Sequence, residues 1–411
     1  MKVKKFKKAV KKIIVACSII SIILESSGRD VYAFYRVVSG DFANEDNSFN
    51  LKSEDMYVNI VPSDVIEYAE SRFEGMVETV IKEKKYFDVD INSKNNLILN
   101  DPFVIYSSSG LGTQDPIYYF PVSDKDEIIM VLYVLNNEGE YSAAISTELV
   151  DELEQIGIKK YEEYIYYENG EEIIAENNSN KIIMNEYESD VNIFKDGEQN
   201  KKEFEAMTYE EKAEYVCNTY ANGNEEIINN EDDEKDKSRG FSVKRYNEVK
   251  LDMDGCLVKQ KHNNCWAASV ATVVRYMNYK KYNKLTAEQV CDKLKIDYDK
   301  GGSIYDKQKA LRKYGINCYD YCVLDQINFD CLKFNILEEK PVMMSCKTAN
   351  YRHATTIIGY TTYGGINQIV LHNPGDDKVV SVEYKNSGTS FPYGNHIWKW
   401  EKTLCAYYGS K

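Results

Sequence analysis

A single cysteine stands directly before a run of apolar residues with helical spacing, and this arrangement limits how the C-terminal part of the chain can fold. After Cys265, apolar side chains recur at Ala268, Ala271, Val274 and Met277. The spacing predicts a helix that begins at Cys265. At a helix N-terminus, free backbone N–H groups and the helix dipole favour thiolate over thiol, so this cysteine is well placed to act as a nucleophile.

A glutamine five positions upstream adds to this interpretation. The side-chain amide of Gln260 can donate a hydrogen bond to an oxyanion that forms beside the sulfur, with the backbone N–H of Cys265 as the second donor. Without such a neighbour, a cysteine at the start of a helix is more often a buried core residue. The pair therefore indicates a candidate oxyanion site.

A thiolate nucleophile needs a base, and imidazole suits this role because its pKa is close to neutral. Of the four histidines, His353 begins an apolar, strand-like segment with Ala354 after it, and Asn373 ends the next such segment. An amide at that place can hold the imidazole in orientation. We therefore expect His353 to be the base and Asn373 its orienting group, with Asp376 and Asp377 as alternatives.

The other three histidines are expected to have lesser roles. His372 alternates to the opposite strand face from Asn373, which indicates a structural or surface residue. His262 lies in the loop before the nucleophile, where it can border a substrate cleft, whereas His396 stands among tryptophans and is expected to pack.

Taken together, the stretch 260–269 (Gln-x4-Cys-Trp-Ala-Ala-Ser), the His353-Ala354 strand and Asn373 resemble the active-site segments of papain-like cysteine peptidases. The resemblance is greatest to compact bacterial secreted forms such as the staphopains, or to bacteriocin-processing-type peptidases. The chain differs from the plant and lysosomal forms because two asparagines precede the nucleophile and its glutamine is closer to the cysteine.

This resemblance implies an α+β fold, in which a two-lobed catalytic domain over residues 249–411 has a helical lobe and an antiparallel β lobe. It implies that Cys265 attacks a peptide carbonyl, Gln260 helps to hold the oxyanion, and His353 transfers the proton. The implied partners are protein or peptide substrates, and no cofactor or metal is implied. The same chemistry also serves amidases and transglutaminase-type transferases, and a non-enzymatic adhesin is a further alternative.

Within the expected catalytic domain, the pattern changes from helices to strands. A capping box at Thr286 and Gln289 predicts one helix, and residues 306–314 predict another. Four strands are expected at 342–345, 353–361, 368–372 and 379–384. The active cleft should lie between the two lobes.

Residues 34–221 read as a separate, small α+β domain. Apolar spacing predicts a helix over 63–84 with Ser63 as its cap. Strands are expected at 97–99, 103–106, 117–122, 128–135 and 141–145 as an antiparallel meander, followed by a hairpin within 161–188 and a short helix from Thr208. This order resembles the pro-regions of staphopain-like and streptopain-like peptidases, which implies an intramolecular inhibitor.

The first 33 residues have the pattern of a secretory signal peptide. Seven lysines precede an apolar run over 13–24, and cleavage is expected after Ala33. The run is too short to span a bilayer comfortably, so no stable membrane anchor is expected after the signal is removed. We expect a protein secreted by a Gram-positive bacterium, with activation cleavage in an exposed linker over 222–248.

Charge is unevenly divided along the chain, whose formal net charge is −15. Residues 34–240 are strongly acidic, whereas residues 241–411 have a net positive charge. The division indicates two parts that attract each other, although an acidic surface can also simply maintain solubility. The basic part has no aromatic-interleaved Lys/Arg cluster, so we expect no nucleic-acid partner.

The cysteine count does not give a simple disulfide framework. Ten cysteines are present, of which Cys17 belongs to the expected signal peptide and Cys265 must stay reduced if it is the nucleophile. The spacing of Cys318 and Cys322 is only a weak indication of a zinc site, because no matching second pair accompanies it.

Overall fold

The computed structural model describes residues 61–91, 96–107, 116–137, 139–158, 161, 164–169, 172–186, 198–209, 211–212, 215, 246–318 and 325–408. We call the described residues 61–215 the N-terminal half and residues 246–408 the C-terminal half. The expected signal peptide and most of the expected linker lie outside the described residues.

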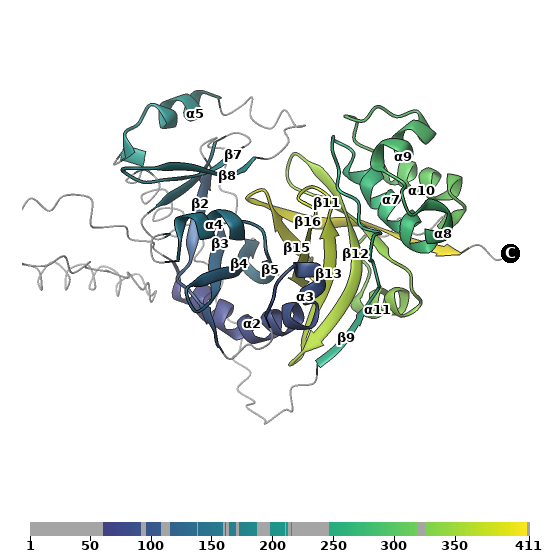
Figure 1. Cartoon of the computed structure of the whole chain (residues 1–411), viewed down its shortest axis with the longest axis horizontal. Helices are drawn as coiled ribbons and strands as arrows, with labels where there is room; N and C mark the ends of the chain where they lie inside the picture. The colour runs from purple at the N-terminus through teal and green to yellow at the C-terminus, as the bar shows by residue number, and fades with distance from the viewer. Residues whose placement is uncertain are drawn as a thin grey trace, which may run out of the picture.

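The N-terminal half is a strand meander with helices packed against it (Figure 1). Its elements are α2 (Ser63–Lys82), α3 (Lys84–Phe87), β1 (Leu97–Leu99), β2 (Phe103–Ser107), β3 (Ile117–Asp124), β4 (Glu127–Asn137), β5 (Glu140–Ser146), α4 (Val150–Ile156), β6 (Ile165–Asn169), β7 (Glu172–Glu176), β8 (Lys181–Glu186) and α5 (Glu198–Glu205).

The predicted first helix is present, but its cap is different. In α2 the apolar residues at helical spacing, including Val65, Ala69 and Val80, are buried. Pro62 occupies the N-cap position and no side chain caps the helix, so the prediction that Ser63 is the cap is wrong. Proline suits this boundary because its fixed φ already matches the first turn of a helix.

The five expected strands of the meander are β1 to β5, and β3, β4 and β5 pair antiparallel in sequence order. The expected hairpin gains a third strand, because β8 pairs with β7. The capping box is formed, with Glu211 N–H donating to Thr208 Oγ1 (3.3 Å) and Thr208 N–H donating to Glu211 Oε2 (2.8 Å). The short helices α4 and α5 were not predicted.

The C-terminal half contains the expected helices followed by strands. Its elements are β9 (Tyr246–Lys250), α7 (Cys265–Met277), α8 (Tyr279–Tyr282), α9 (Ala287–Leu294), α10 (Ile304–Lys313), β10 (Ile316–Cys318), α11 (Phe329–Leu337), β11 (Val342–Lys347), β12 (Arg352–Tyr363), β13 (Ile366–Asn373), β14 (Lys378–Glu383), β15 (Ser390–Tyr393) and β16 (His396–Tyr408). The capping box of α9 at Thr286 is formed as predicted, and a second one at Ser303 starts α10.

One predicted boundary needs correction. Residues 246–248 were assigned to the linker, but β9 begins at Tyr246 and pairs antiparallel with β12 up to Tyr363. Strand pairing satisfies the backbone groups of β9 and holds this segment in the sheet. The linker therefore ends before Tyr246.

The two halves share one sheet. All sixteen strands of the described part of the chain are connected, and the junction is the antiparallel pairing of β5 with β14, where Ser381 is opposite Ile145 and Val382 is opposite Ala144. In Figure 1 the meander lies on one side of the C-terminal sheet and α7 to α10 lie on the other. The fold is thus of the mixed α+β class, as predicted, with a large and mostly antiparallel sheet.

Helix α2 contacts the C-terminal sheet through a fully buried polar cluster. The Thr79 hydroxyl donates to Gln368 Oε1 (3.0 Å), and Gln368 Nε2 donates to the Gly75 carbonyl (3.2 Å). Ser381 Oγ also donates to Gln368 Oε1 (2.8 Å), and Thr361 lies 3.1 Å from the Thr79 hydroxyl. Because these hydroxyl and amide groups satisfy each other, the cluster can be buried without a large desolvation cost.

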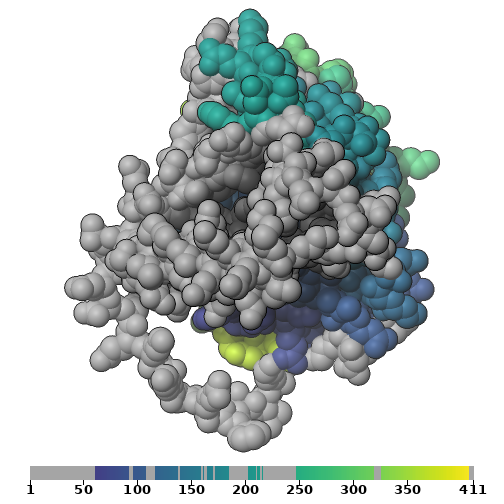
Figure 2. Space-filling model, turned by 90° about the vertical axis from the view of Figure 1, so that its left-hand side faces the viewer, coloured from purple at the N-terminus to yellow at the C-terminus, as the bar shows by residue number. Residues whose placement is uncertain are grey.

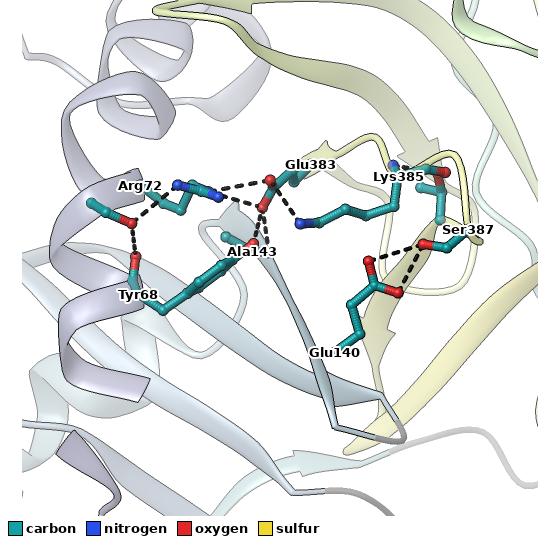
Figure 3. Close-up of polar contacts among 9 residues, drawn as sticks. Tyr68, Arg72, Glu140, Ala143, Glu383, Lys385 and Ser387 are labelled. Atoms are coloured by element: carbon teal, nitrogen blue, oxygen red, sulfur yellow. Dashed lines mark hydrogen bonds and ion pairs between the residues drawn. The ribbon is translucent and has the colours of Figure 1, made fainter. Parts of the chain in front are cut away.

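A second cross-half contact is centred on the carboxylate of Glu383, at the end of β14 (Figure 3). It accepts hydrogen bonds from the Tyr68 hydroxyl (2.5 Å), the Arg72 guanidinium (3.2 Å) and the Ala143 N–H (3.3 Å). The Lys385 ammonium is 3.2 Å away. Because Glu383 is buried, its negative charge needs these donors and cations to compensate the loss of hydration.

In the ion pairs between the halves, the cation can come from either half. Arg72 pairs with Glu383 and Lys85 with Asp254, so the cation belongs to the acidic N-terminal half in each case. Lys250 pairs with Glu83 in the opposite sense. Figure 2, which faces the N-terminal half, shows that the described surface on this side is mostly formed by that half. No helix among the described residues is long and apolar enough to span a membrane.

Candidate active site

The helix predicted from the apolar spacing does begin at Cys265. Asn264 occupies the N-cap position of α7 without a side-chain cap, and the Trp266 indole is buried beneath the loop before α10, where its Nε1 donates to the Lys300 carbonyl (3.2 Å). A Cβ on Gly302 would come within 2.3 Å of the indole, so only glycine fits there. These contacts fix the first turn of the helix that holds the sulfur.

His353 and Asn373 meet across two neighbouring strands. His353 lies at the start of β12 and Asn373 at the end of β13, and His353 Nε2 is 2.6 Å from Asn373 Oδ1. The amide oxygen can only accept, so this bond places the imidazole proton on Nε2 and leaves Nδ1 as the basic nitrogen. The Gly375 N–H also donates to Asn373 Oδ1 (3.1 Å), which holds the amide in place.

Cys265, at the start of α7, contacts the strand β12 that contains His353. The Ala354 backbone N–H, next to His353, hydrogen-bonds to its sulfur together with backbone N–H groups at the start of α7. Burial raises the pKa of the Cys265 thiol, although the Lys307 ammonium and these N–H groups act to lower it. The structure thus brings the helix start and the His353 segment together.

Aromatic side chains from β15 and β16 pack around the imidazole. The ring of Tyr393 is stacked at 5.1 Å from His353, and that of Trp398 is tilted at 5.4 Å. Burial lowers the pKa of His353 to about 4, against the opposing effect of its bond to Asn373. The imidazole is therefore neutral over most of the physiological pH range.

Gln260 is held by its backbone beside the Asn373 loop, where its N–H donates to the Pro374 carbonyl (2.9 Å). Its side-chain Oε1 is buried and has no hydrogen-bond partner among the described residues. The backbone of Gln260 is thus next to the loop that follows Asn373.

The alternative orienting carboxylates do not contact His353. Asp377 instead accepts a hydrogen bond from His372, with 2.9 Å between Oδ1 and Nε2, and His372 is fully buried. Asp376 is half-buried, and desolvation raises its pKa to about 6. His372 is thus structural, which was one of the two roles proposed for it.

The remaining histidines lie away from the bond between His353 and Asn373. His262 is partly exposed and contacts Asp299, with 3.2 Å between Nδ1 and Oδ1. His396 is largely buried and its ring is edge-on to Trp398, so the expectation that it packs agrees with the structure. Among the described residues, no group of three or more His, Cys, Asp or Glu side chains is placed to hold a metal ion.

Sequence reasoning missed one charged residue at this site. Lys307 of α10 is only 3 % exposed, and its ammonium acts on both Cys265 and His353. A signal was present, because Ile304, Lys307 and Leu311 follow helical spacing and place the lysine on the apolar stripe.

The turn between β15 and β16, next to the aromatic side chains around His353, is held by the N-terminal half. The Tyr119 hydroxyl donates to Asn395 Oδ1 (3.0 Å), and Asn395 Nδ2 donates to the Ile105 carbonyl (3.1 Å). Glu168 Oε1 is 3.6 Å from His396 Nε2. Burial raises the pKa of Glu168 to about 8 and lowers that of His396 to about 4, so both groups are neutral near pH 6.

This contact predicts a pH-dependent stability. The pKa of Glu168 is higher when folded than when unfolded, so the stability that it contributes is lost as pH rises through about 8. We expect Glu168→Gln to raise the midpoint of thermal unfolding at pH 8.5 by about 2–5 °C and to change it little at pH 5. Glu67→Gln, on the exposed side of α2, is the matched control; an equal effect of both variants at pH 8.5 would contradict the prediction.

One comparison with known proteins found a match. Residues 244–388 match the family model of the papain-like cysteine protease AvrRpt2, peptidase family C70. The match includes Gln260, Cys265, His353 and Asn373 and begins next to β9. No curated protein was found to match the chain. By this match over residues 244–388, the protein is a papain-like cysteine protease, which is a hydrolase.

Proposed function

We propose that the protein is a secreted cysteine endopeptidase, similar to the compact bacterial forms, that is made as an inactive precursor. Cys265 attacks the carbonyl carbon of a peptide bond, and His353 Nδ1 takes the thiol proton. The side chain of Gln260 and the N–H of Cys265 hold the oxyanion of the tetrahedral intermediate. His353 then gives the proton to the leaving amine, and water hydrolyses the thioester that remains.

The observation that carries this proposal is the 2.6 Å bond between His353 and Asn373 on the strand whose Ala354 N–H contacts the sulfur of Cys265. A histidine in a sheet does not need this arrangement for stability. A bond from Nε2 to an amide oxygen fixes one tautomer and leaves Nδ1 available as a base, which is what thiol activation requires.

We further propose that the N-terminal half is a pro-domain that inhibits the enzyme within the same chain. Its support is that Tyr119, Ile105 and Glu168 hold the turn next to the aromatic residues that contact His353. The catalytic groups themselves are largely inaccessible, since His353 is only 6 % exposed and Asn373 is fully buried. A substrate needs access to these groups, so the pro-domain must move or leave before catalysis.

Three measurements test this function, each starting from the full-length protein. N-terminal sequencing of the mature form should place the first residue between 222 and 246 if the preceding residues are a pro-region. Digestion of casein, but not of peptidoglycan, is expected from an endopeptidase, whereas the reverse result would indicate a cell-wall amidase. A thiol-directed epoxysuccinyl probe should label Cys265 in the mature form, and a lack of labelling would favour a non-enzymatic protein.

A further inference from the structure

Lys307 is a charged side chain in the interior of the C-terminal half. It lies on the buried face of α10, between Ile304 and Leu311, and is 3 % exposed. Burial of an ammonium group is costly unless an anion or several hydrogen-bond acceptors compensate it. An apolar residue at this position would fill the same space without that cost, so the charge requires its own explanation.

The nearby groups that could compensate this charge are few. The ammonium donates one hydrogen bond, to Ser345 Oγ at 2.5 Å. In the described part of the chain no carboxylate forms an ion pair with Lys307. Glu401 acts on it from a distance only, after the stronger effects of Cys265 and Cys346, and is itself paired with Arg352 and Lys347.

The position of Ser345 brings the ammonium to the strands that carry the catalytic groups. In the pairing of β11 with β12, Ser345 is opposite Ala354 and Cys346 is opposite His353. Ala354 is the residue whose N–H contacts the sulfur of Cys265. Lys307, Ser345, Ala354 and Cys265 therefore form a connected series of neighbours between α10 and the start of α7.

We propose that Lys307 is a positioning residue that sets the charge of the nucleophile, because its ammonium beside the Cys265 sulfur stabilises the thiolate. This inference rests on the proposed catalytic role of Cys265. In this proposal Lys307 supplies a positive charge that stabilises the thiolate, a role that is otherwise expected only of a protonated histidine. His353 still takes the thiol proton and passes it to the leaving amine, and after that transfer it is neutral, which is the form needed to activate the water that hydrolyses the thioester.

The electrostatics of the three groups agree with this assignment. Burial lowers the pKa of Lys307. Of the groups that raise this pKa, the Cys265 sulfur has the largest effect, so the ammonium and the thiolate stabilise each other. The same ammonium lowers the pKa of the Cys265 thiol and of His353. A positive charge acts in this sense on both groups, because it stabilises a neighbouring anion and destabilises a neighbouring cation.

The test is the pH dependence of alkylation of Cys265 by iodoacetamide in the full-length chain, with the modified cysteine identified by peptide mass spectrometry. At pH 6 we expect Lys307→Met and Lys307→Gln each to slow the alkylation of Cys265 by about tenfold or more, which corresponds to about one pKa unit. Lys309→Met, which removes an exposed lysine from the same helix, should leave the profile unchanged. The exposed Cys331 is an internal reference whose alkylation should not respond to any of the three variants.

The glutamine variant separates charge from structure. Glutamine can still donate a hydrogen bond to Ser345 Oγ but has no charge, so a purely structural lysine predicts the wild-type profile for Lys307→Gln. That profile would overturn the proposal, and Lys307→Gln also serves as the test if Lys307→Met does not fold. The two proposals can fail separately. If Cys265→Ala still hydrolyses peptides, Cys265 has no role in catalysis, but the alkylation profile still shows whether Lys307 lowers the pKa of the Cys265 thiol.

Discussion

Full-length Cys265→Ala is expected to accumulate as the uncut precursor and to hydrolyse no peptide. Removal of the nucleophile eliminates the covalent pathway, and what remains is binding and oxyanion stabilisation. Knockouts of this kind lower kcat by at least about 10⁴-fold in enzymes with a nucleophile and a base. Casein hydrolysis measures the activity, and gel electrophoresis of the culture medium measures the length of the secreted chain.

The control for this variant is Cys331→Ala, which removes an exposed thiol on α11. It should mature and hydrolyse casein as the unsubstituted protein does. Hydrolysis by Cys265→Ala at more than about one-hundredth of the normal rate would reject Cys265 as the nucleophile. A precursor that is cut but inactive would instead show that another protease performs the activation.

Glu383→Gln is expected to weaken the attachment of the N-terminal half more than any other single charge change among the contacts described above. The carboxylate is 6 % exposed and receives donors from both halves, so its loss leaves the Arg72 and Lys385 cations without their anion. Removal of one partner of a buried ion pair costs about 3–5 kcal/mol. Because Arg72 and Lys385 are 23 % and 21 % exposed, solvent should reduce the cost to about 2–3 kcal/mol.

The measurement is urea unfolding of full-length chains that also contain Cys265→Ala, so that no cleavage complicates the transition. Glu401→Gln is the matched control, because Glu401 pairs with the 77 % exposed Arg352 within the C-terminal sheet and makes no contact described above with the N-terminal half. We expect its cost to be below about 1 kcal/mol. In the active chain, Glu383→Gln should also shorten the time to maturation; equal effects of the two glutamine variants would remove Glu383 from the attachment.

The residues of the candidate site could be selected from the sequence because each has a local signal. Helical spacing after Cys265 gives the helix start, and the strand that follows His353 consists of small and β-branched residues that are typical of a buried sheet. The Asn-Pro-Gly sequence after β13 marks the strand end where Asn373 lies. Consecutive strands usually pair, and the pairing of β12 with β13 brings His353 next to Asn373.

Elements that were missed fall into two groups. For α11 and β16 a local signal was present, because Phe329, Leu332 and Ile336 have helical spacing and Trp398 and Trp400 alternate with polar residues. For β15 no such signal exists, since the strand has four residues and contains Pro392. The pairing of β5 with β14 could not be predicted, because no local pattern specifies the register of strands so distant in the chain.

That pairing has a consequence for how the protein is made. The meander consists of strands that pair with their neighbours in sequence, so it can form early and quickly during synthesis. The C-terminal strands emerge later. Strands β11 to β14 pair in sequence order, but β11 also needs β16 and β14 also needs β5, and such long-range pairing is the slow and aggregation-prone kind of β folding. The free edge of β5 can then serve as a template for β14, so we expect the N-terminal half to assist the folding of the C-terminal half.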